Sequence, residues 1–155
     1  MAFFNVQDAI SGKQAKAYVN LEGRVEELFY ARTLEATIEK NKTDVPILGK
    51  TKTSQRAAGW NGSGTLNIYY VTSIFRELMM RYVKTGRDFY FDLTVVNEDP
   101  QSSVGKQTVV LKNCNLDSVT IAKFDATSDE MLNEDLPFTF DDVDILDQFS
   151  QPVAL

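Results

Sequence analysis

The sequence of 155 residues contains no histidine, and this absence excludes several kinds of enzyme chemistry. Without an imidazole there is no Ser-His-Asp or Cys-His catalysis and no histidine-ligated metal. The single cysteine, Cys114, cannot form an internal disulfide or build a zinc site alone, and no histidine is present to activate it as a nucleophile. We therefore predict that Cys114 is a small buried thiol, which suits a reducing cytoplasm.

Long apolar runs are also missing. No stretch approaches the roughly 20 apolar residues of a membrane helix, and the opening residues MAFFNVQDAISGK lack the pattern of a signal peptide. We therefore expect no membrane anchoring. The 43% hydrophobic and 25% charged residues are ordinary for a globular protein. The length predicts a single domain over 1–155, with an N-terminal arm (about 1–12) and a C-terminal tail (about 147–155) that we expect to be flexible.

The chain has no overall excess of positive charge, because its net charge is −6. Residues 1–115 carry 15 basic and 12 acidic side chains, whereas residues 116–155 carry 1 basic and 10 acidic ones. A non-specific DNA binder needs clustered cations to neutralise phosphates, so this balance disfavours DNA binding. The asymmetry instead predicts either a solvated acidic tail or two complementary surfaces on one molecule.

Gly49-Lys50-Thr51 matches the end of a phosphate-binding loop, but the rest of that motif is absent. The first glycine of the motif would fall at Asp44, and no apolar helix follows to direct its N–H groups at a phosphate. The acidic run DDVDILD also lacks the glycine of a calcium-binding loop. We therefore predict no catalytic residue, no cofactor and no metal. A nucleotide-dependent enzyme is kept only as a third interpretation, which retention on immobilised ATP would test.

The sequence does contain many short segments with the alternating pattern of β-strands. Leu34, Ala36 and Ile38 alternate with polar residues, and Leu66, Ile68 and Tyr70 share one face of a second segment. Further strands are predicted within 14–20, 88–96, 106–113, 116–126 and 136–142. The segment RVEELFYA (24–31) is compatible with a helix by its composition.

One helix is clearly predicted, over about 73–85. Thr72 or Ser73 can cap its N-terminus, and Gly86 ends it. Apolar residues recur along it and predict one buried face, formed by Ile74, Phe75, Leu78, Met79 and Tyr82. The fold class is therefore mainly β with one α-helix (α+β): an antiparallel β-sandwich or barrel against which the helix packs.

Residues 41–58 have no apolar face and contain Pro46 and Gly49, so we predict a long loop or an extended hairpin, called the arm below. Five basic residues lie in it or next to it: Lys40, Lys42, Lys50, Lys52 and Arg56.

Three blocks of the sequence resemble the tail tube (core tail) proteins of contractile-tailed phages and of PBSX-like defective prophages. They are GWNGSGTLNIYYVTSIFRELMMRYVKTGRDFYFDL (59–93), NEDPQSSVGKQTVVLKNCNLDS (97–118) and FTFDDVDIL (138–146). The likeness runs in order from about Ile10 to about Leu146. It depends on glycine, turn and strand patterns rather than on chemically reactive residues.

The resemblance implies a fold similar to other tail tube proteins and to the haemolysin-coregulated tube protein (Hcp) of type VI secretion. It also implies hexameric rings whose sheets join into an inner β-barrel, with the helix outside, stacked into a tube within a contractile sheath. The implied partners are other copies of the chain, the sheath protein, baseplate or initiator proteins and a tail terminator. DNA would pass through the lumen without specific binding. The implied location is the virion, after assembly in the bacterial cytoplasm.

For such a tube we hypothesise that the basic arm meets acidic surface on a neighbouring subunit or ring. The candidate residues are Lys40, Lys42, Lys50, Lys52 and Arg56 on the arm, and Asp125, Asp129, Glu130, Glu134, Asp135, Asp141, Asp142 and Asp144, in a run that continues to Asp147. A cationic wall would retain phosphate, so we predict a neutral to acidic lumen. The alternative is a small soluble β-barrel that binds a ligand. These residues do not distinguish a phage tube from that of a defective prophage or a bacteriocin-like particle.

Overall fold

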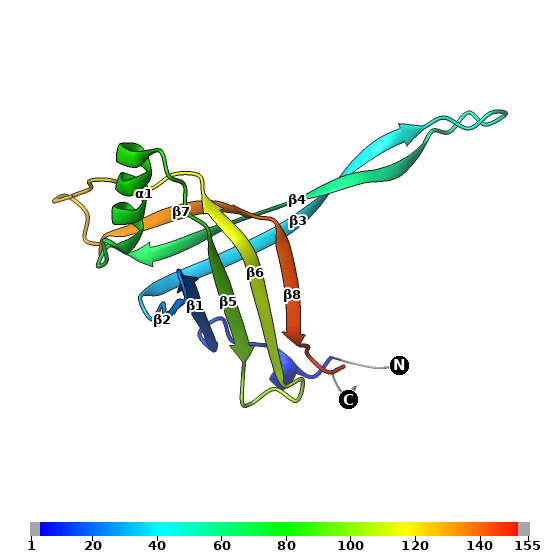
Figure 1. Ribbon diagram of the computed structural model, residues 1–155. Helices are drawn as coiled ribbons and strands as arrows, with labels where there is room; N and C mark the ends of the chain where they lie inside the picture. Colours follow the sequence, from blue (N-terminus) through cyan, green and yellow to red (C-terminus); the bar gives the residue numbers. More distant parts are fainter. Residues whose placement is uncertain (1–3, 152–155) are drawn as a thin grey trace.

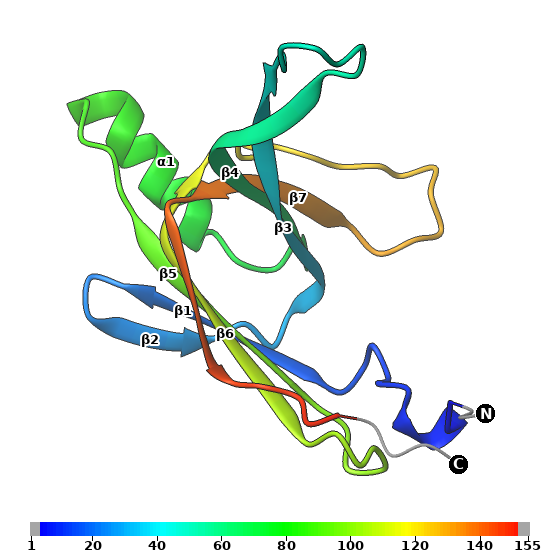
Figure 2. The ribbon, with the colours of Figure 1, turned by 90° about the vertical axis from the view of Figure 1, so that its right-hand side faces the viewer.

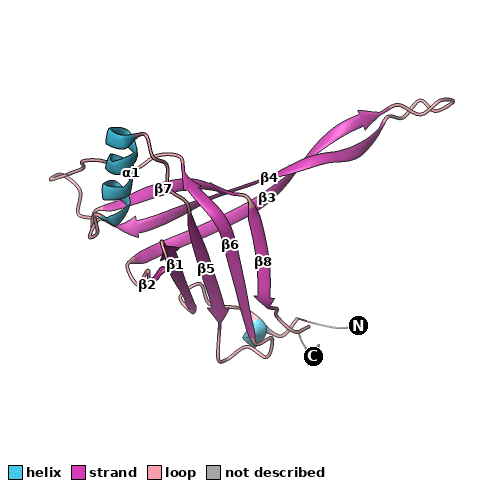
Figure 3. Cartoon of the chain, viewed as in Figure 1, coloured by secondary structure: helices cyan, strands magenta, loops and turns pink. Residues whose placement is uncertain are grey.

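Two antiparallel sheets and one helix make up residues 4–151, the part of the chain that this computed structural model describes (Figure 1, Figure 3). The elements in chain order are η1 (Val6–Asp8), β1 (Ala15–Leu21), β2 (Arg24–Glu27), β3 (Ala31–Val45), β4 (Ser54–Tyr69), α1 (Ile74–Thr85), β5 (Phe91–Glu98), β6 (Lys106–Leu116), β7 (Asn133–Phe140) and β8 (Asp142–Asp147). The predicted class, mainly β with one helix and antiparallel pairing, is confirmed.

Strand β6 belongs to both sheets. Sheet A has the order β2-β1-β5-β6-β8, and sheet B joins β7, β4 and β3 to the end of β6. Only Asn115 and Leu116 of β6 pair with β7. Just before them, Asn113 has a φ of 54°, a conformation that asparagine tolerates better than most residues. Asn113 therefore marks the corner at which β6 leaves one sheet for the other.

The hydrophobic core lies between the two sheets, as the alternating patterns predict. Leu66 and Ile68 of β4 are buried, and so are Leu136 and Phe138 of β7. Two glycines in β4 make room for aromatic rings of β7: a Cβ on Gly62 would lie 2.4 Å from Phe140, and one on Gly64 would lie 2.7 Å from Phe138. The described core comprises Ala17, Val19, Leu28, Leu66, Ile68, Phe75, Phe89, Phe91, Leu93, Leu111, Cys114, Leu116, Leu136, Phe138 and Phe140.

Helix α1 lies at the predicted position, but its buried face is shorter than predicted. Its last turn closes at Gly86, which has a φ of 73° and donates its N–H to the Tyr82 carbonyl at 2.8 Å. Phe75 is 1% exposed, but Tyr82 is 43% exposed. The prediction of a buried Tyr82 is therefore wrong, because the core side chains contact only the first half of the helix.

Two assignments of secondary structure are also wrong. Residues 24–27, which composition made compatible with a helix, form β2 because they pair with Tyr18–Leu21 of β1. Of the strand expected over 116–126, only Leu116 is paired. Residues 117–132 form a connection without strand or helix, and Ile121–Met131 are exposed throughout. A strand requires a neighbouring strand as well as an alternating pattern, and this segment has no strand partner in the described structure.

Both ends of the described chain contact the turn between β5 and β6 (Figure 2). The Asp8 carboxylate accepts hydrogen bonds from the Ser103 N–H at 2.9 Å and the Ser103 hydroxyl at 2.6 Å. The Ser150 N–H donates to the Val104 carbonyl at 2.8 Å. The N-terminal arm and the C-terminal tail were expected to be flexible. Residues 1–3 and 152–155 of these two segments lie outside the described residues, so that expectation stays a prediction.

Candidate assembly surface

The arm is an extended hairpin, one of the two predicted forms. The outer halves of β3 and β4 pair from Lys42 opposite Ala57 to Val45 opposite Ser54, and residues 46–53 join them. This hairpin projects away from both sheets (Figure 1). Every residue from Thr37 to Thr53 is exposed. At about 3.3 Å per residue, the paired part alone extends roughly 16 Å beyond Lys40.

The exposed arm carries both positive charge and an apolar tip. Among the described residues, none of its five basic side chains forms an ion pair: Lys40, Lys42, Lys50, Lys52 and Arg56. At the tip, Leu48 is fully exposed and Ile47 is 38% exposed. An isolated two-stranded hairpin is at best marginally stable in water. The arm therefore has the properties of a segment that binds a partner.

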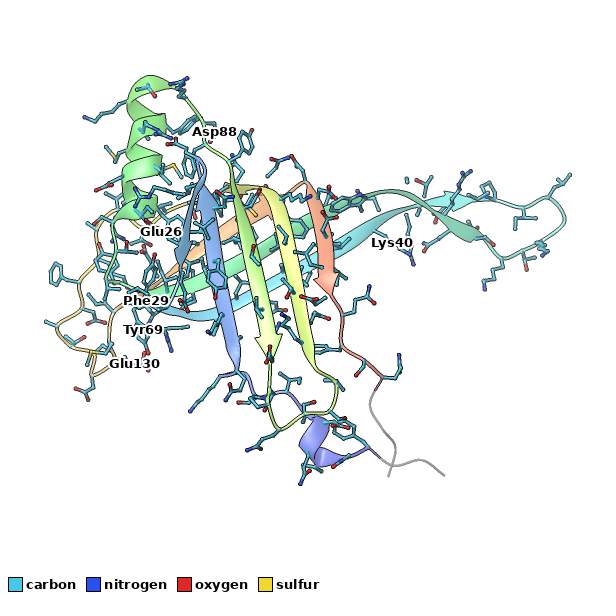
Figure 4. The ribbon with its side chains drawn as sticks, turned by 60° about the horizontal axis from the view of Figure 1, so that its bottom comes forward. Glu26, Phe29, Lys40, Tyr69, Asp88 and Glu130 are labelled. Atoms are coloured by element: carbon cyan, nitrogen blue, oxygen red, sulfur yellow. The ribbon has the colours of Figure 1, made fainter. Side chains whose placement is uncertain are left out.

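Three of the acidic candidates lie together on the connection between β6 and β7, called the acidic loop below (residues 117–132). They are Asp125, Asp129 and Glu130, and all are exposed. The Thr127 hydroxyl and N–H donate to Asp125 at 2.7 Å and 3.0 Å and lower the pKa of that carboxyl, so it stays ionised. Figure 4 shows Glu130 at the opposite side of the molecule from Lys40 of the arm. One chain thus carries the two complementary charges at its two ends.

The acidic loop also exposes large apolar side chains, and two of them, Ile121 and Phe124, lie in the segment 116–126 that was predicted to be a strand. Phe124 is 88% exposed, Met131 is 74% exposed and Ile121 is 55% exposed. The Asp-Ala-Thr-Ser-Asp cluster at 125–129 is the local turn signal that could have identified the loop. Charge and apolar surface together make it a second candidate contact.

Glu134 is a correction, because the structure buries it in an internal ion pair. Arg76 of α1 donates to both Glu134 oxygens at 2.9 Å, and the Glu134 side chain is 1% exposed. The Arg76 guanidinium also lies 4.3 Å from the centre of the Tyr70 ring and donates to the Thr120 carbonyl at 3.5 Å. Glu134 lies on the same face of β7 as Leu136, which is the core side. Its carboxylate is therefore not accessible to a partner. The pair instead joins the helix, sheet B and the start of the acidic loop.

The remaining acidic candidates lie on strands or directly before one. Asp135 faces away from the core and accepts a hydrogen bond from the Asn67 side chain at 2.7 Å. Asp141 precedes β8, and Asp142 and Asp144 lie in it. Lys112 contacts Asp144 at 2.5 Å, and this hydrogen bond raises the pKa of the lysine. The structure therefore separates these candidates from the acidic loop and places most of them at an edge of sheet A.

Sheet A has an open edge on each side. Within the described residues, β8 pairs only with β6, so its outer side has no strand beside it. On the opposite side, β2 pairs with β1 only from Tyr18 to Leu21, which leaves the first half of β1 uncovered. A groove of about 680 Å³ lies beside that half, between β1 and the start of β3. Unpaired strand edges are places where another chain can add a strand.

In the part of the chain that the structure describes, the metal-ligating side chains form no cluster and the one cysteine is buried. In residues 4–151 no group of three or more His, Cys, Asp or Glu side chains is placed to hold a metal ion. Cys114 is fully buried, and burial raises the pKa of its thiol to about 12. Over the same range, no helix has the length and apolar character needed to cross a membrane.

Comparison with known proteins gives consistent matches over nearly the whole chain. A family model described as "Phage tail tube protein" matches residues 2–147. The Phage-like element PBSX protein XkdM of Bacillus subtilis (strain 168) is 44% identical over 144 residues, which cover 93% of this chain and 95% of that protein.

Two solved structures share the fold at low sequence identity. The sheath/tube terminator of the PVC extracellular contractile injection system has a TM-score of 0.70 at 16% identity and covers 92% of this chain and 100% of that one. Hcp1 from Flavobacterium johnsoniae has a TM-score of 0.50 at 11% identity and covers 84% of this chain and 94% of that one. The expected fold of the tail tube and Hcp type is confirmed.

Proposed function

The chain belongs to the phage tail tube protein family and has that family's structural role, and from this premise we propose that six copies close into a ring and that rings stack into the inner tube of a contractile tail. The tube is the conduit for DNA ejection and the rigid rod that is driven through the host envelope. No catalytic step is involved. The particle is a phage or a phage-tail-like particle.

The observation that carries the ring is the pair of open edges on sheet A. β1, β5, β6 and β8 run alternately up and down, because each neighbouring pair is antiparallel. Copies related by rotation about the tube axis would therefore meet as β8 against β1 in the same antiparallel sense. Six such sheets make 24 strands, which at ~4.8 Å spacing enclose a circle about 37 Å across. Sheet B does not extend this row of strands, because it meets β6 only at Asn115 and Leu116, beyond the corner at Asn113.

The lumen would then be the face of sheet A that points away from the core. One cross-strand row on the core face consists of Val19, Leu93, Leu111 and Val143. The next row, Tyr18, Thr94, Val110 and Asp144, points to the other face. The charged side chains on this face are three lysines (Lys16, Lys106 and Lys112) and five acids (Asp92, Glu98, Asp142, Asp144 and Asp147), so its net charge is slightly negative. This supports the predicted neutral to acidic lumen, which does not hold DNA phosphates.

Stacking would use the two ends of the molecule. The basic arm and the acidic loop are different surfaces of one chain, so their contact is head-to-tail and propagates as a filament rather than closing. The apolar tip at Leu48 and the exposed Phe124 and Met131 would supply most of the affinity. Each exposed ion pair contributes only about 0–1 kcal/mol, so the charges mainly select orientation. Among the acidic candidates, Asp125, Asp129 and Glu130 fit this role best.

The remaining partners follow from the family. A sheath protein would surround the tube, baseplate or initiator proteins would nucleate it and a terminator would cap it. Assembly in the bacterial cytoplasm would place the chain in the tail of the virion.

The test is the length of tubes seen by negative-stain electron microscopy, with wild-type protein and initiator proteins of the same tail. The variant Lys50→Glu/Lys52→Glu should still form rings but give shorter tubes. The matched control is Lys84→Glu/Arg87→Glu, which reverses two exposed charges away from the arm. An unchanged distribution of tube lengths would rule out the arm as a stacking contact. Wild-type tails without sixfold rings would overturn the proposed function itself.

A further inference from the structure

We propose that a β-bulge at the base of the arm, formed by Ala58 and Gly59, keeps the Arg56 side chain free to bind a partner. The bulge does so by placing Arg56 on the face of the arm opposite to that of Asp44. This inference rests on the proposed stacking role of the arm and specifies which backbone feature controls its charge. Gly59 is a positioning residue, because it acts through the direction of another side chain.

The bulge is a break in the pairing of β3 with β4. Asn41 lies opposite Gly59, but the next residue of β3, Lys42, lies opposite Ala57. Within this described stretch, Ala58 is therefore an extra residue of β4 with no residue of β3 across from it. Beside it, Gly59 has a φ of 141°, which residues with a side chain rarely adopt. The arm starts at this point and projects as a twisted ribbon (Figure 1).

Gly59 is required for its backbone conformation rather than for lack of space. A Cβ built on Gly59 would meet nothing within 4 Å among the described residues. Gly62 and Gly64 of the same strand differ, because a Cβ there would collide with the rings of Phe140 and Phe138. A side chain at position 59 would therefore act on the bulge and leave the packing of the core unchanged.

The bulge decides which face of the arm carries Arg56. Side chains alternate along a strand, and residues directly opposite each other on paired strands share a face. Arg56 lies opposite Thr43, whereas Asp44 lies opposite Gln55 and accepts a hydrogen bond from its side chain at 3.2 Å. Arg56 and Asp44 therefore point to opposite faces, and among the described residues Arg56 forms no ion pair.

Regular pairing of the same residues would give the opposite result. With Ala58 paired to Lys42, each earlier residue of β4 would move one position along β3, and Arg56 would lie opposite Asp44. Opposite charges directly across two strands attract, so the arginine would pair with the aspartate of its own arm. Burial does not prevent this change, because residues 41–53 and 55–61 are exposed.

The bulged register gives the arm positive charge on both faces. Lys40 and Lys42 lie on the same face as Asp44, and Arg56 lies on the other. A free guanidinium can bind a carboxylate through two hydrogen bonds, and the acidic loop of the next copy offers exposed carboxylates. Arg56 is therefore the residue through which the bulge acts on stacking.

The first experiment measures the register of the arm by disulfide formation within one chain. Thr43→Cys/Arg56→Cys should cross-link, and Asp44→Cys/Arg56→Cys should not, because side chains on opposite faces point apart. Gly59→Val should reverse this preference, since valine favours regular strand geometry. Cys114 does not interfere, because it is buried. Cross-linking of the Asp44 pair without Gly59→Val, or no reversal with it, would overturn the role of the bulge.

The second experiment compares tube lengths by negative-stain electron microscopy, with initiator proteins of the same tail. Gly59→Val should keep the wild-type circular dichroism spectrum and shorten the tubes as much as Arg56→Ala does. Deleting Ala58 removes the bulge but leaves Arg56 opposite Thr43, so this control should form tubes of normal length. The same deletion added to Gly59→Val should restore the tubes, because it returns Arg56 to its original face.

Normal tubes with Gly59→Val, or no restoration by the deletion, would overturn the inference. If Lys50→Glu/Lys52→Glu shortens the tubes while Gly59→Val does not, the arm remains a stacking contact and only the role of the bulge is lost. Wild-type tails without sixfold rings would instead remove the proposed function on which this inference rests.

Discussion

Replacing Arg76 by methionine should lower the free energy of unfolding by about 3–5 kcal/mol, because it leaves the buried Glu134 carboxylate without its counter-ion. Glu134 is 1% exposed and receives two hydrogen bonds at 2.9 Å from this one guanidinium. Water cannot replace them without opening the contact between α1 and β7. Methionine retains much of the side-chain volume, so packing losses are kept small.

The effect is measured by urea unfolding of the monomer and by thermal melts. For a chain of this size, 3–5 kcal/mol corresponds to a drop in Tm of about 6–20 °C. Glu134→Gln should cost less, because Arg76 is 14% exposed and keeps Tyr70 and the Thr120 carbonyl as partners. It is the milder variant if the methionine variant does not fold.

The double variant Arg76→Met/Glu134→Leu isolates the interaction between the two charges. Removing both leaves no uncompensated charge, so it should be more stable than Arg76→Met alone. A loss below about 1 kcal/mol for Arg76→Met, or costs that simply add in the double variant, would refute the assignment of Glu134 as an internal structural residue.

Three further predictions concern single sites. Gly64→Ala should lower the free energy of unfolding in urea by about 1–3 kcal/mol or more, because the added Cβ would lie 2.6 Å from the Glu35 carbonyl oxygen. Gly12→Ala is the control and should be nearly neutral, because its added Cβ would meet nothing within 4 Å. Equal losses for the two variants would contradict this. Since burial raises the pKa of Cys114 to about 12, an aromatic disulfide reagent at pH 8 should label the thiol only in denaturant, and rapid labelling of folded protein would show that it is accessible. Hydrogen bonds from the Ser103 hydroxyl and N–H lower the pKa of Asp8 from 3.8. Wild type should therefore be more stable than Asp8→Asn at neutral pH, and this difference in the free energy of unfolding should disappear as the pH falls below about 3.8. A difference that grows in acid would contradict this sign.

Local patterns in the sequence determined much of the fold. Alternation placed Leu66 and Ile68 on the core side of β4, and Leu136 and Phe138 on that of β7, because side chains of a strand point to opposite faces in turn. The limits of α1 were also readable, since Gly86 adopts the positive φ that ends a helix. Lack of an apolar face predicted the exposed arm. Each of these features depends on neighbours within a few positions.

Other features of the fold were decided by tertiary contacts between segments that are distant in the sequence. Residues 24–27 form a strand because β1 lies beside them. The segment after Leu116 forms a loop because no strand of the described residues pairs with it. Glu134 and Asp135 carry the same charge. Only Glu134 is buried, where Arg76, which is distant in the sequence, pairs with it. The open edges of sheet A likewise depend on which strands meet. Periodicity specifies which side chains share a face, but burial and pairing depend on the elements that long-range folding brings to that face.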